Sequence, residues 1–290
     1  MLYYLFQWLH KIGMPGSGVF QYISFRSATA FVLALFVSMF FGKSFIRLMR
    51  RKQIGESVRE LGLAGQSEKA GTPTMGGIII IAAILLPVLL LCQLKNIYVL
   101  LMIFTTLWLG LLGFADDYIK VFKHNKEGLS PRKKLIGQIF LGLVVGAVMY
   151  FHPAAVICEK ATEAPVLTPV ESALQVENQE NAQTPKIFGE PHQSIKTTIP
   201  FVKNHEIDYS KLTRWMGDES GKWSFLFFIP IIVFIIAAVS NGANLTDGLD
   251  GLATGTTSVI AVGIAILAYV SGNVVFANYL NIMYMHDYKN

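Results

Sequence analysis

Long apolar runs follow one another along the chain, and charged residues are almost confined to the links between them. A helix that crosses a bilayer needs about 20 apolar residues, and the charge-free runs approach that length. They are Ser27–Gly42, which Val19–Phe25 could extend despite Arg26, and then Gly76–Leu94, Ile97–Ala115, Leu135–Phe151, Phe225–Gly242 and Leu252–Phe276. This pattern predicts an all-α polytopic membrane protein with about six transmembrane helices.

The composition favours the same class. Of the 290 residues, 53% are hydrophobic and 15% are charged, and the mean hydropathy is +0.48. Soluble domains carry roughly 25% charged residues, so this chain suits a membrane better than water. Buried helices of a large soluble protein are the alternative, and the repetition of such runs argues against it.

Basic residues are concentrated in two of the short links. By the positive-inside rule these links are cytoplasmic, which makes the N-terminus extracytoplasmic. The net charge of +5 then follows from topology and lipid attraction, and it does not indicate nucleic acid. The first link holds Lys43, Arg47, Arg50, Arg51, Lys52, Arg59 and Lys69, and the second holds Lys120, Lys123, Lys126, Arg132, Lys133 and Lys134.

The spacing of the runs predicts three parts. Residues 1–151 hold the first four spans with two cytoplasmic loops, residues 152–222 form an extracytoplasmic polar loop, and residues 223–290 hold the last two spans. The first half of the polar loop, rich in Glu and Gln, is typical of a disordered or loosely folded segment. Its second half, with Ile195–Val202 and Trp215–Trp223, predicts a short hairpin or surface helix. Cys92 and Cys158 offer neither a disulfide framework nor a metal spacing.

Two adjacent acids end the third run, in the stretch "FADDYIK". If the helix continues past Ala115, Lys120 lies one turn beyond Asp116 and three residues beyond Asp117. Acids at a membrane edge usually face a polar cavity, and two neighbouring carboxylates repel unless a cation compensates them. Mg²⁺ would do so, since it binds carboxylates together with substrate phosphates. Alternatively, the acids simply end the helix in water.

Two further polar motifs fall on the same predicted face. In "KAGTPTMGG", Lys69 precedes Thr72 and a proline, which is a pattern typical of a helix start that binds an anion, or of a plain helix cap. In "NGANLTDGLDGLATG", the residues Asn244, Asp247 and Asp250 recur every third position, which keeps them near one helix face. Together the three motifs suit transfer of a phosphate-bearing group, although an Asp-Gly turn alone is common.

The segments "KAGTPTMGG", "FADDYIK", "GLSPRKKLIGQ" and "NLTDGLDGLA" resemble the signatures of the phospho-N-acetylmuramoyl-pentapeptide-transferase family, within the polyprenyl-phosphate sugar-1-phosphate transferases. The resemblance covers roughly residues 20–151 and 225–280. It implies a multi-pass protein of the bacterial inner membrane that transfers a phospho-sugar from UDP-N-acetylmuramoyl-pentapeptide to undecaprenyl phosphate. The implied products are lipid I, a peptidoglycan precursor, and UMP, and the implied cofactor is Mg²⁺.

The resemblance also implies roles for particular residues. It makes Asp116, Asp117 and Asp247 catalytic, with one of the adjacent pair acting as base or nucleophile, and it leaves that choice open. Metal binding falls to Asp116, Asp117, Asn244 and Asp247. Substrate binding falls to Lys69, Thr72, Lys120, Lys134, Asn244 and Asp250. A homodimer is one assembly that the resemblance allows.

The chain also departs from the family pattern. The family usually has ten spans, with a further metal-binding aspartate and a histidine-rich loop in its later part. This sequence has neither after its sixth run, which predicts a chain truncated there. Two other functions stay open besides an inactive fragment: an N-acetylglucosamine-1-phosphate transferase to the same lipid, and a cation transporter with intramembrane acids.

Overall fold

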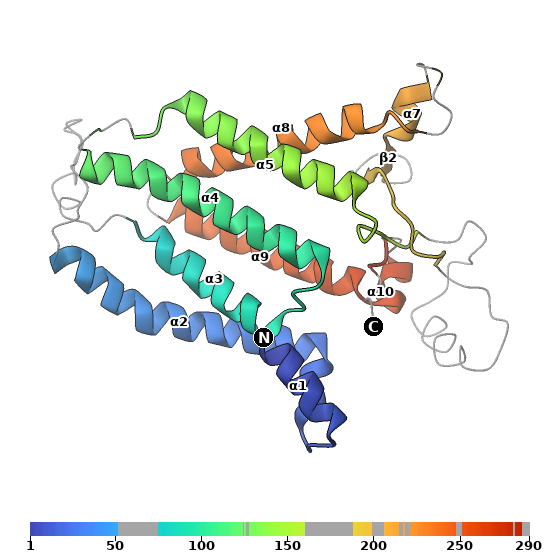
Figure 1. The fold of residues 1–290 in the computed structure, drawn as a ribbon, viewed down its shortest axis with the longest axis horizontal. Helices are drawn as coiled ribbons and strands as arrows, with labels where there is room; N and C mark the ends of the chain where they lie inside the picture. The colour runs from blue at the N-terminus through green and yellow to red at the C-terminus, as the bar shows by residue number, and fades with distance from the viewer. Residues whose placement is uncertain are drawn as a thin grey trace. The chain divides into compact units, whose positions relative to one another are not determined.

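The computed structural model describes residues 1–51, 75–123, 125, 128–159, 188–198, 206–214, 217, 221–247, 251–280 and 282–285. The chain divides into two compact units, Met1–Leu141 and Gly142–Asn290, which we describe separately. Figure 1 shows the course of the chain.

Nearly all regular structure is helical. The first unit holds α1 (Leu2–Lys11), the 3₁₀ helix η1 (Ser17–Gln21), α2 (Ile23–Arg51), α3 (Gly77–Leu91) and α4 (Ile97–Phe122), and α5 (Pro131–Phe151) begins there. The second unit holds the end of α5, then β1 (Lys196–Thr198), β2 (Glu206–Asp208), α7 (Ser210–Thr213), α8 (Phe225–Thr246), α9 (Leu252–Ser271) and α10 (Val274–Tyr279).

The prediction of an all-α polytopic membrane protein is confirmed. Among the described residues, five helices are long and apolar enough to cross a membrane: α2, α4, α5, α8 and α9. The second predicted span is the shorter apolar helix α3, which has 15 residues with Pro87 inside it. The orientation of the N-terminus stays a prediction.

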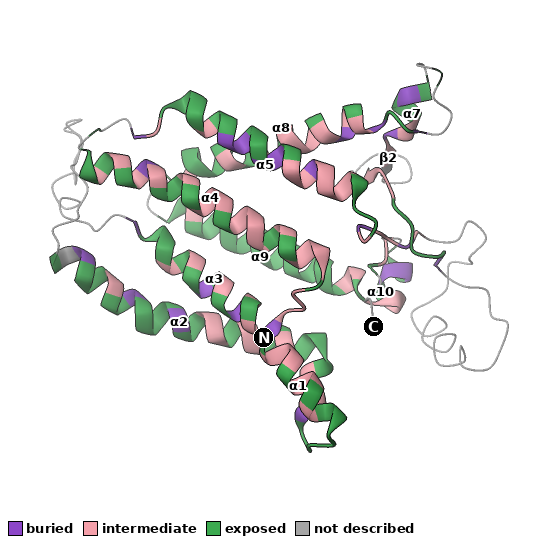
Figure 2. Cartoon of the chain, in the orientation of Figure 1, coloured by how far each residue is buried: buried purple, intermediate pink, exposed green. Residues whose placement is uncertain are grey.

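Many positions on these helices are exposed (Figure 2), and large apolar side chains are among them. Phe31 and Phe36 on α2 are exposed, and so are Val259 and Ile264 on α9. Contiguous apolar surface of this kind is unfavourable in water and marks a surface that faces lipid or protein. The exposed faces therefore agree with the membrane assignment that hydropathy makes.

The sixth predicted span ends earlier than expected. The prediction ran to Phe276, but α9 ends at Ser271. The side chain of Asn273 accepts hydrogen bonds from the backbone N–H groups of Val275 and Phe276, which starts the separate helix α10. A side-chain cap of this kind satisfies N–H groups that a continuous helix would bond internally. Hydropathy did not reveal this break, because it lies within a largely apolar run.

Neighbouring helices of the first unit run antiparallel. Arg26 of α2 donates to the Leu91 carbonyl at the end of α3, while Gly42 lies against Ile79 near the start of α3. Gly110 of α4 faces Ile81, and the indole N–H of Trp108 donates to the Gly137 carbonyl of α5 over 2.9 Å. Consequently the end of α2, the start of α3, the end of α4 and the start of α5 all lie at one end of this unit (Figure 1).

In the second unit, α5 and α8 pack with almost no space between their backbones. A Cβ atom added at Gly142 would lie 2.6 Å from the Val233 Cα atom, and one added at Gly146 would lie 3.3 Å from the Ile229 Cα atom. Further along, Tyr150 contacts Phe225 and Phe228 through its ring. Small residues at such crossings are the usual means by which membrane helices approach closely.

Of the hairpin and the surface helix predicted as alternatives for the second half of the polar loop, a short hairpin is present, although its second strand is Glu206–Asp208 and not part of Trp215–Trp223. Strand β1 pairs with β2 in antiparallel register, with Lys196 opposite Asp208 and Thr198 opposite Glu206. Most of the segment predicted to be disordered or loosely folded lies outside the described residues. The residues on either side of it are described. The Gly189 N–H donates to the Glu159 carbonyl over 2.9 Å, and Ile157 forms a bridge with His192.

A small ionic cluster around Glu159 lies at the same point of the fold. Lys196 and Ser194 donate to the Glu159 carboxylate, and the Nε2 atom of His192 lies 3.5 Å from it. Burial raises the pKa of the Glu159 carboxyl, but the hydrogen bonds from Lys196 and Ser194 lower it by more. The resulting pKa is below its usual value. The cluster also neighbours a core of Cys158, Phe188 and Ala277, and Cys158 bridges to Tyr284.

We expect Gly142→Ala to destabilise the protein by about 1–3 kcal/mol, because its methyl group would force the α5 and α8 backbones apart. Gly263→Ala is the control, since a Cβ atom there meets open space on α9. It should be neutral or stabilising. Thermal unfolding of both variants in detergent measures the difference, and equal midpoints would contradict the close packing.

The Glu159 cluster should weaken in acid. Because its pKa is lowered on folding, its contribution is complete above about pH 4.5 and is lost as the pH falls through the folded value. Hydrogen-exchange protection of the Ile157, Gly189 and His192 amides should therefore fall in that range. Glu159→Gln should show lower protection with little pH dependence, and a wild-type slope in that variant would argue against the cluster.

Candidate functional site

Helix α4 continues past Ala115 to Phe122, so the adjacent acids and Lys120 all lie on its last turns. Asp116 is 7% exposed, and both of its carboxylate oxygens are bonded. Its Oδ2 atom lies 2.9 Å from the Lys120 ammonium, and its Oδ1 atom lies 3.0 Å from the Lys134 ammonium. The Leu129 N–H also donates to Oδ1, over 2.7 Å. Helical spacing puts Lys120 one turn beyond Asp116 and three residues beyond Asp117, and in the structure Lys120 contacts Asp116.

The link between α4 and α5 turns so that its backbone lies against the Asp116 carboxylate. Gly128 has a φ of 69°, a left-handed conformation that glycine adopts without strain. A Cβ atom at this position would collide with the Asp116 carboxylate and the Lys120 side chain. Ser130 and then Pro131 begin α5, with proline at a first helical position that needs no N–H. The turn thereby places Leu129 and Lys134 beside Asp116.

Asp117 occupies a different environment. The next residue of a helix lies about 100° further round its axis, so Asp117 does not share the position of Asp116 between the lysines. Its side chain is half-buried. Both adjacent residues are aspartates, but their surroundings in the structure differ.

The cations that compensate Asp116 are lysines. The sequence predicted Mg²⁺ beside the acidic pair, because such a pair needs a nearby positive charge. In the structure two ammonium groups meet that need at Asp116, and each would repel a metal ion. Mg²⁺ also requires carboxylate lone pairs that are not already accepting hydrogen bonds. Asp116 therefore fits a metal poorly, and the assignment of Asp117 and Asp247 as metal ligands stays a prediction.

The second acidic motif lies at the end of α8. Asn244 is on the last turn of this helix, Asp247 is its C-cap, and both are exposed. Thr246 does not cap the helix, because its hydroxyl donates back to the Gly242 carbonyl over 2.8 Å. An aspartate at a helix C-terminus is disfavoured by the helix dipole. That penalty is offset when a cation binds there, which favours a functional reason for Asp247.

Three predicted site residues, Lys69, Thr72 and Asp250, lie outside the described residues. The described end of the "KAGTPTMGG" motif has an unusual backbone at Met75, which is buried with a φ of 67°. A left-handed conformation is uncommon for a residue with a side chain, and it is often retained at functional positions. Sequence patterns carried no signal for it.

The structure brings together Asp116, Lys120 and Lys134. Asn244 and Asp247 belong to the second unit. Their approach to the Asp116 cluster therefore stays a prediction. Among the described residues, no three His, Cys, Asp or Glu side chains are grouped closely enough to hold a metal. The assignment of metal ligands therefore also stays a prediction.

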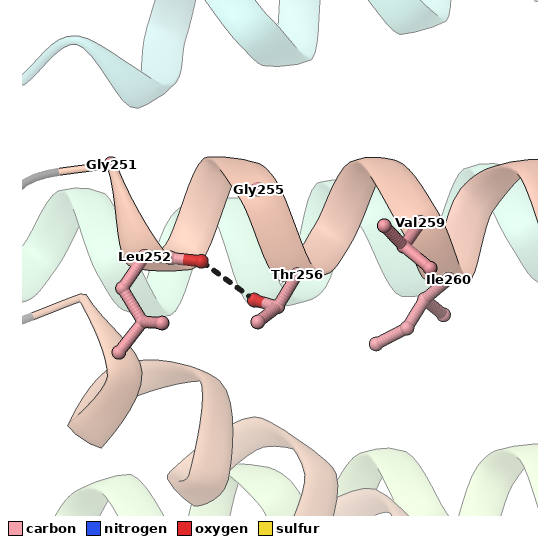
Figure 3. A pocket seen from close by; sticks show the side chains of 6 residues that line it. All are labelled: Gly251, Leu252, Gly255, Thr256, Val259 and Ile260. Carbon is pink, nitrogen blue, oxygen red and sulfur yellow. Dashed lines mark hydrogen bonds between the residues drawn. The ribbon is translucent and has the colours of Figure 1, made fainter.

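A hollow of about 520 Å³ lies along α9 (Figure 3), lined by Gly251, Leu252, Gly255, Thr256, Val259 and Ile260. Its lining is almost wholly apolar. The Thr256 hydroxyl donates to the Leu252 carbonyl of its own helix. Gly251, Leu252 and Gly255 of this lining belong to the end of the "NGANLTDGLDGLATG" motif, but the lining side chains offer no acid–base or metal chemistry.

Two contacts of this site could not be read from the sequence. Lys134 was predicted to bind phosphate, and its pairing with Asp116 depends on how the intervening link folds. The Leu129 N–H is a backbone group and leaves no mark in a side-chain pattern. The available signal was the spacing of Gly128 before Ser130 and Pro131, which is typical of a tight turn that leads into a helix.

Comparison with known sequences gives concordant matches. The sequence model of glycosyl transferase family 4 matches residues 193–286. The model for phospho-N-acetylmuramoyl-pentapeptide-transferase signature 1 matches residues 69–81.

Several curated relatives carry the name phospho-N-acetylmuramoyl-pentapeptide-transferase. The protein of Flavobacterium johnsoniae is 54% identical over 288 residues, which are 98% of this chain and 68% of the relative. That of Flavobacterium psychrophilum is 53% identical with the same coverage, and that of Parabacteroides distasonis is 50% identical and covered to 65%. The chain thus spans about two thirds of the length of the relatives it matches.

We expect Gly128→Ala to disrupt the link between α4 and α5, because its methyl group would meet the Asp116 carboxylate and its φ is unfavourable. The loss should be about 1–3 kcal/mol. Trypsin cleavage at Lys123, within the link, should become faster. Gly113→Ala is the control, since it lies on α4 with open space around it. Equal cleavage rates in the two variants would show that the turn is not constrained.

Proposed function

The chain belongs to the phospho-N-acetylmuramoyl-pentapeptide-transferase family, and on that premise we propose that it transfers phospho-N-acetylmuramoyl-pentapeptide from its UDP-linked donor to undecaprenyl phosphate. The products would be lipid I and UMP, in peptidoglycan synthesis. The observation that carries this proposal is the 54% identity across 98% of the chain. We place the protein in the bacterial inner membrane, with its site on the cytoplasmic face.

The reaction forms one bond and breaks one bond. An oxygen of the lipid phosphate attacks the phosphorus that carries the sugar, and the bond from that phosphorus to the UMP oxygen breaks. UMP leaves with the electron pair. Catalysis of phosphoryl transfer consists mainly of positioning and of neutralising charge on the phosphate oxygens. Cationic side chains near a membrane surface suit both tasks.

The described side chains supply these elements in part. Lys120 and Lys134 lie together at the end of the first unit and can neutralise phosphate charge. Lys69 and Thr72, which precede α3 in the sequence, and Asp250, which follows α8 in the sequence, complete the proposed substrate contacts, although all three lie outside the described residues. Undecaprenyl phosphate would approach within the membrane, along apolar helix faces.

We propose Mg²⁺ as the cofactor, with Asp117, Asn244 and Asp247 as the side chains that would hold it. Their oxygen atoms are the ligand type that Mg²⁺ prefers. When bound, the ion would neutralise charge on the diphosphate. Asp116 was also predicted to be a ligand, but its two lysine contacts support a different role.

The runner-up function is transfer of N-acetylglucosamine-1-phosphate to the same lipid. The signature match at residues 69–81 and the names of the relatives favour the muramoyl donor. A cation transporter would carry its acids at mid-membrane, whereas Asp116, Asp117 and Asp247 lie at helix ends.

The test is UMP release by the purified protein, given undecaprenyl phosphate and each nucleotide sugar in turn. We expect turnover with UDP-N-acetylmuramoyl-pentapeptide. Asp117→Asn and Asp247→Asn should each lower it by about 10²–10³-fold. Asp208→Asn, in the hairpin of the second unit, is the control, because an amide oxygen can still accept from Ser210.

Exclusive use of the N-acetylglucosamine donor would replace the proposed substrate. Ion flux in liposomes without UMP release would favour the transporter. Wild-type rates in the Asp117 and Asp247 variants would remove those residues from the site.

A further inference from the structure

The Asp116 cluster combines one carboxylate with two ammonium groups, so it keeps a net positive charge. The side chain of Asp116 is 10% exposed, whereas those of Lys120 and Lys134 are 40% and 28% exposed. The acid is therefore enclosed, and the two cations are accessible. A ligand that reaches this cluster meets ammonium groups first.

We propose that Asp116 is a positioning residue, which holds Lys120 and Lys134 as a paired cationic site for a substrate phosphate, and that it is neither the nucleophile nor a metal ligand. This inference rests on the proposed function, since it assigns a role within the same site.

The hydrogen-bond inventory supports the assignment. A carboxylate has about four lone-pair positions, and three contacts from Lys120, Lys134 and Leu129 already use three of them. Electron density committed in this way is poorly available for attack on phosphorus or for a metal ion. Each ammonium group, in contrast, has three N–H donors and directs one of them at Asp116. The remaining donors can bind a phosphate oxyanion.

The two lysines come from different helices, and this explains why a carboxylate is needed between them. Lys120 comes from the end of α4, and Lys134 comes from the first turn of α5. Two ammonium groups from different helices repel each other and would separate without an anion between them. Asp116 supplies that anion, and its bond from the Leu129 N–H fixes the start of α5 at the same time. The phosphate site is thus preorganised before substrate arrives.

Two substrates of the proposed reaction carry phosphate: the lipid monophosphate and the nucleotide-sugar diphosphate. The chemistry of the lysine pair suits either. Separate Michaelis constants (KM) for the two substrates identify which one it holds.

The central experiment compares Asp116→Asn with Asp117→Asn, the same change on adjacent residues. An asparagine at position 116 would turn an NH₂ donor toward an ammonium or amide donor, which should separate the lysines. We expect the KM for one phosphate substrate to rise at least about tenfold, by more than kcat falls. Binding of Mn²⁺, followed by electron paramagnetic resonance without substrate, should stay within about twofold of wild type. In Asp117→Asn it should weaken by at least about tenfold.

A second series covers the case in which Asp116→Asn does not fold. Lys134→Gln should raise the same KM, while Lys133→Gln, a change at its exposed neighbour, should not. If Asp116 acts through the lysines, the double variant Asp116→Asn/Lys134→Gln should be little worse than either single variant. Lys134→Gln should also leave Mn²⁺ affinity unchanged.

Weaker Mn²⁺ binding in Asp116→Asn, or additive effects in the double variant, would overturn the positioning role. So would an equal KM in Lys134→Gln and Lys133→Gln. These outcomes are distinct from failure of the proposed function, which would appear as a wild-type protein that releases no UMP from either nucleotide sugar. In that case the Mn²⁺ measurements still decide whether Asp116 binds metal.

Discussion

A buried carboxylate at the end of a membrane helix is stable only if cations and donors surround it. Asp116 is in that situation, and its partners come from one turn further along α4, from the link that follows, and from the start of α5. These contacts hold the start of α5 beside the end of α4. Once Lys134 and Leu129 are in place, Gly137 comes to face Leu112 and to accept from Trp108.

The remaining packing depends on small residues. In a membrane, burial of apolar surface gives little drive for helices to associate, because lipid tails are as apolar as leucine side chains. Close approach must supply the attraction instead. Gly110 against Ile81, Gly137 against Leu112, and Gly142 against Val233 provide it, while the outer faces remain apolar. In the first unit the side chains of Ile81 and Leu112 pack onto glycines, whereas in the second unit the α5 and α8 backbones themselves approach closely.

Much of the helical architecture could be predicted from the sequence, because membrane helices correspond directly to charge-free runs. The charge-free run ends at Ala115, so the continuation of α4 to Phe122 was only a condition in the sequence analysis, and the pairing of Lys120 with Asp116 depends on it. The role of Lys134 could not be foreseen, since it depends on the turn at Gly128. The end of α9 before Asn273 was missed because a polar cap inside an apolar run changes hydropathy very little. The bridge from Cys158 to Tyr284 joins distant positions, for which local patterns carry no information.

The described residues on either side of the segment 160–187 are joined to each other. Glu159 accepts from the Gly189 N–H, and Ile157 pairs with His192. The intervening chain therefore starts and finishes at a single point of the fold. Doubling the length of such a loop adds only about 0.6 kcal/mol of closure entropy. This is consequently a position where related proteins can differ greatly in length, and where a reporter sequence can be inserted, without altering the arrangement of the membrane helices.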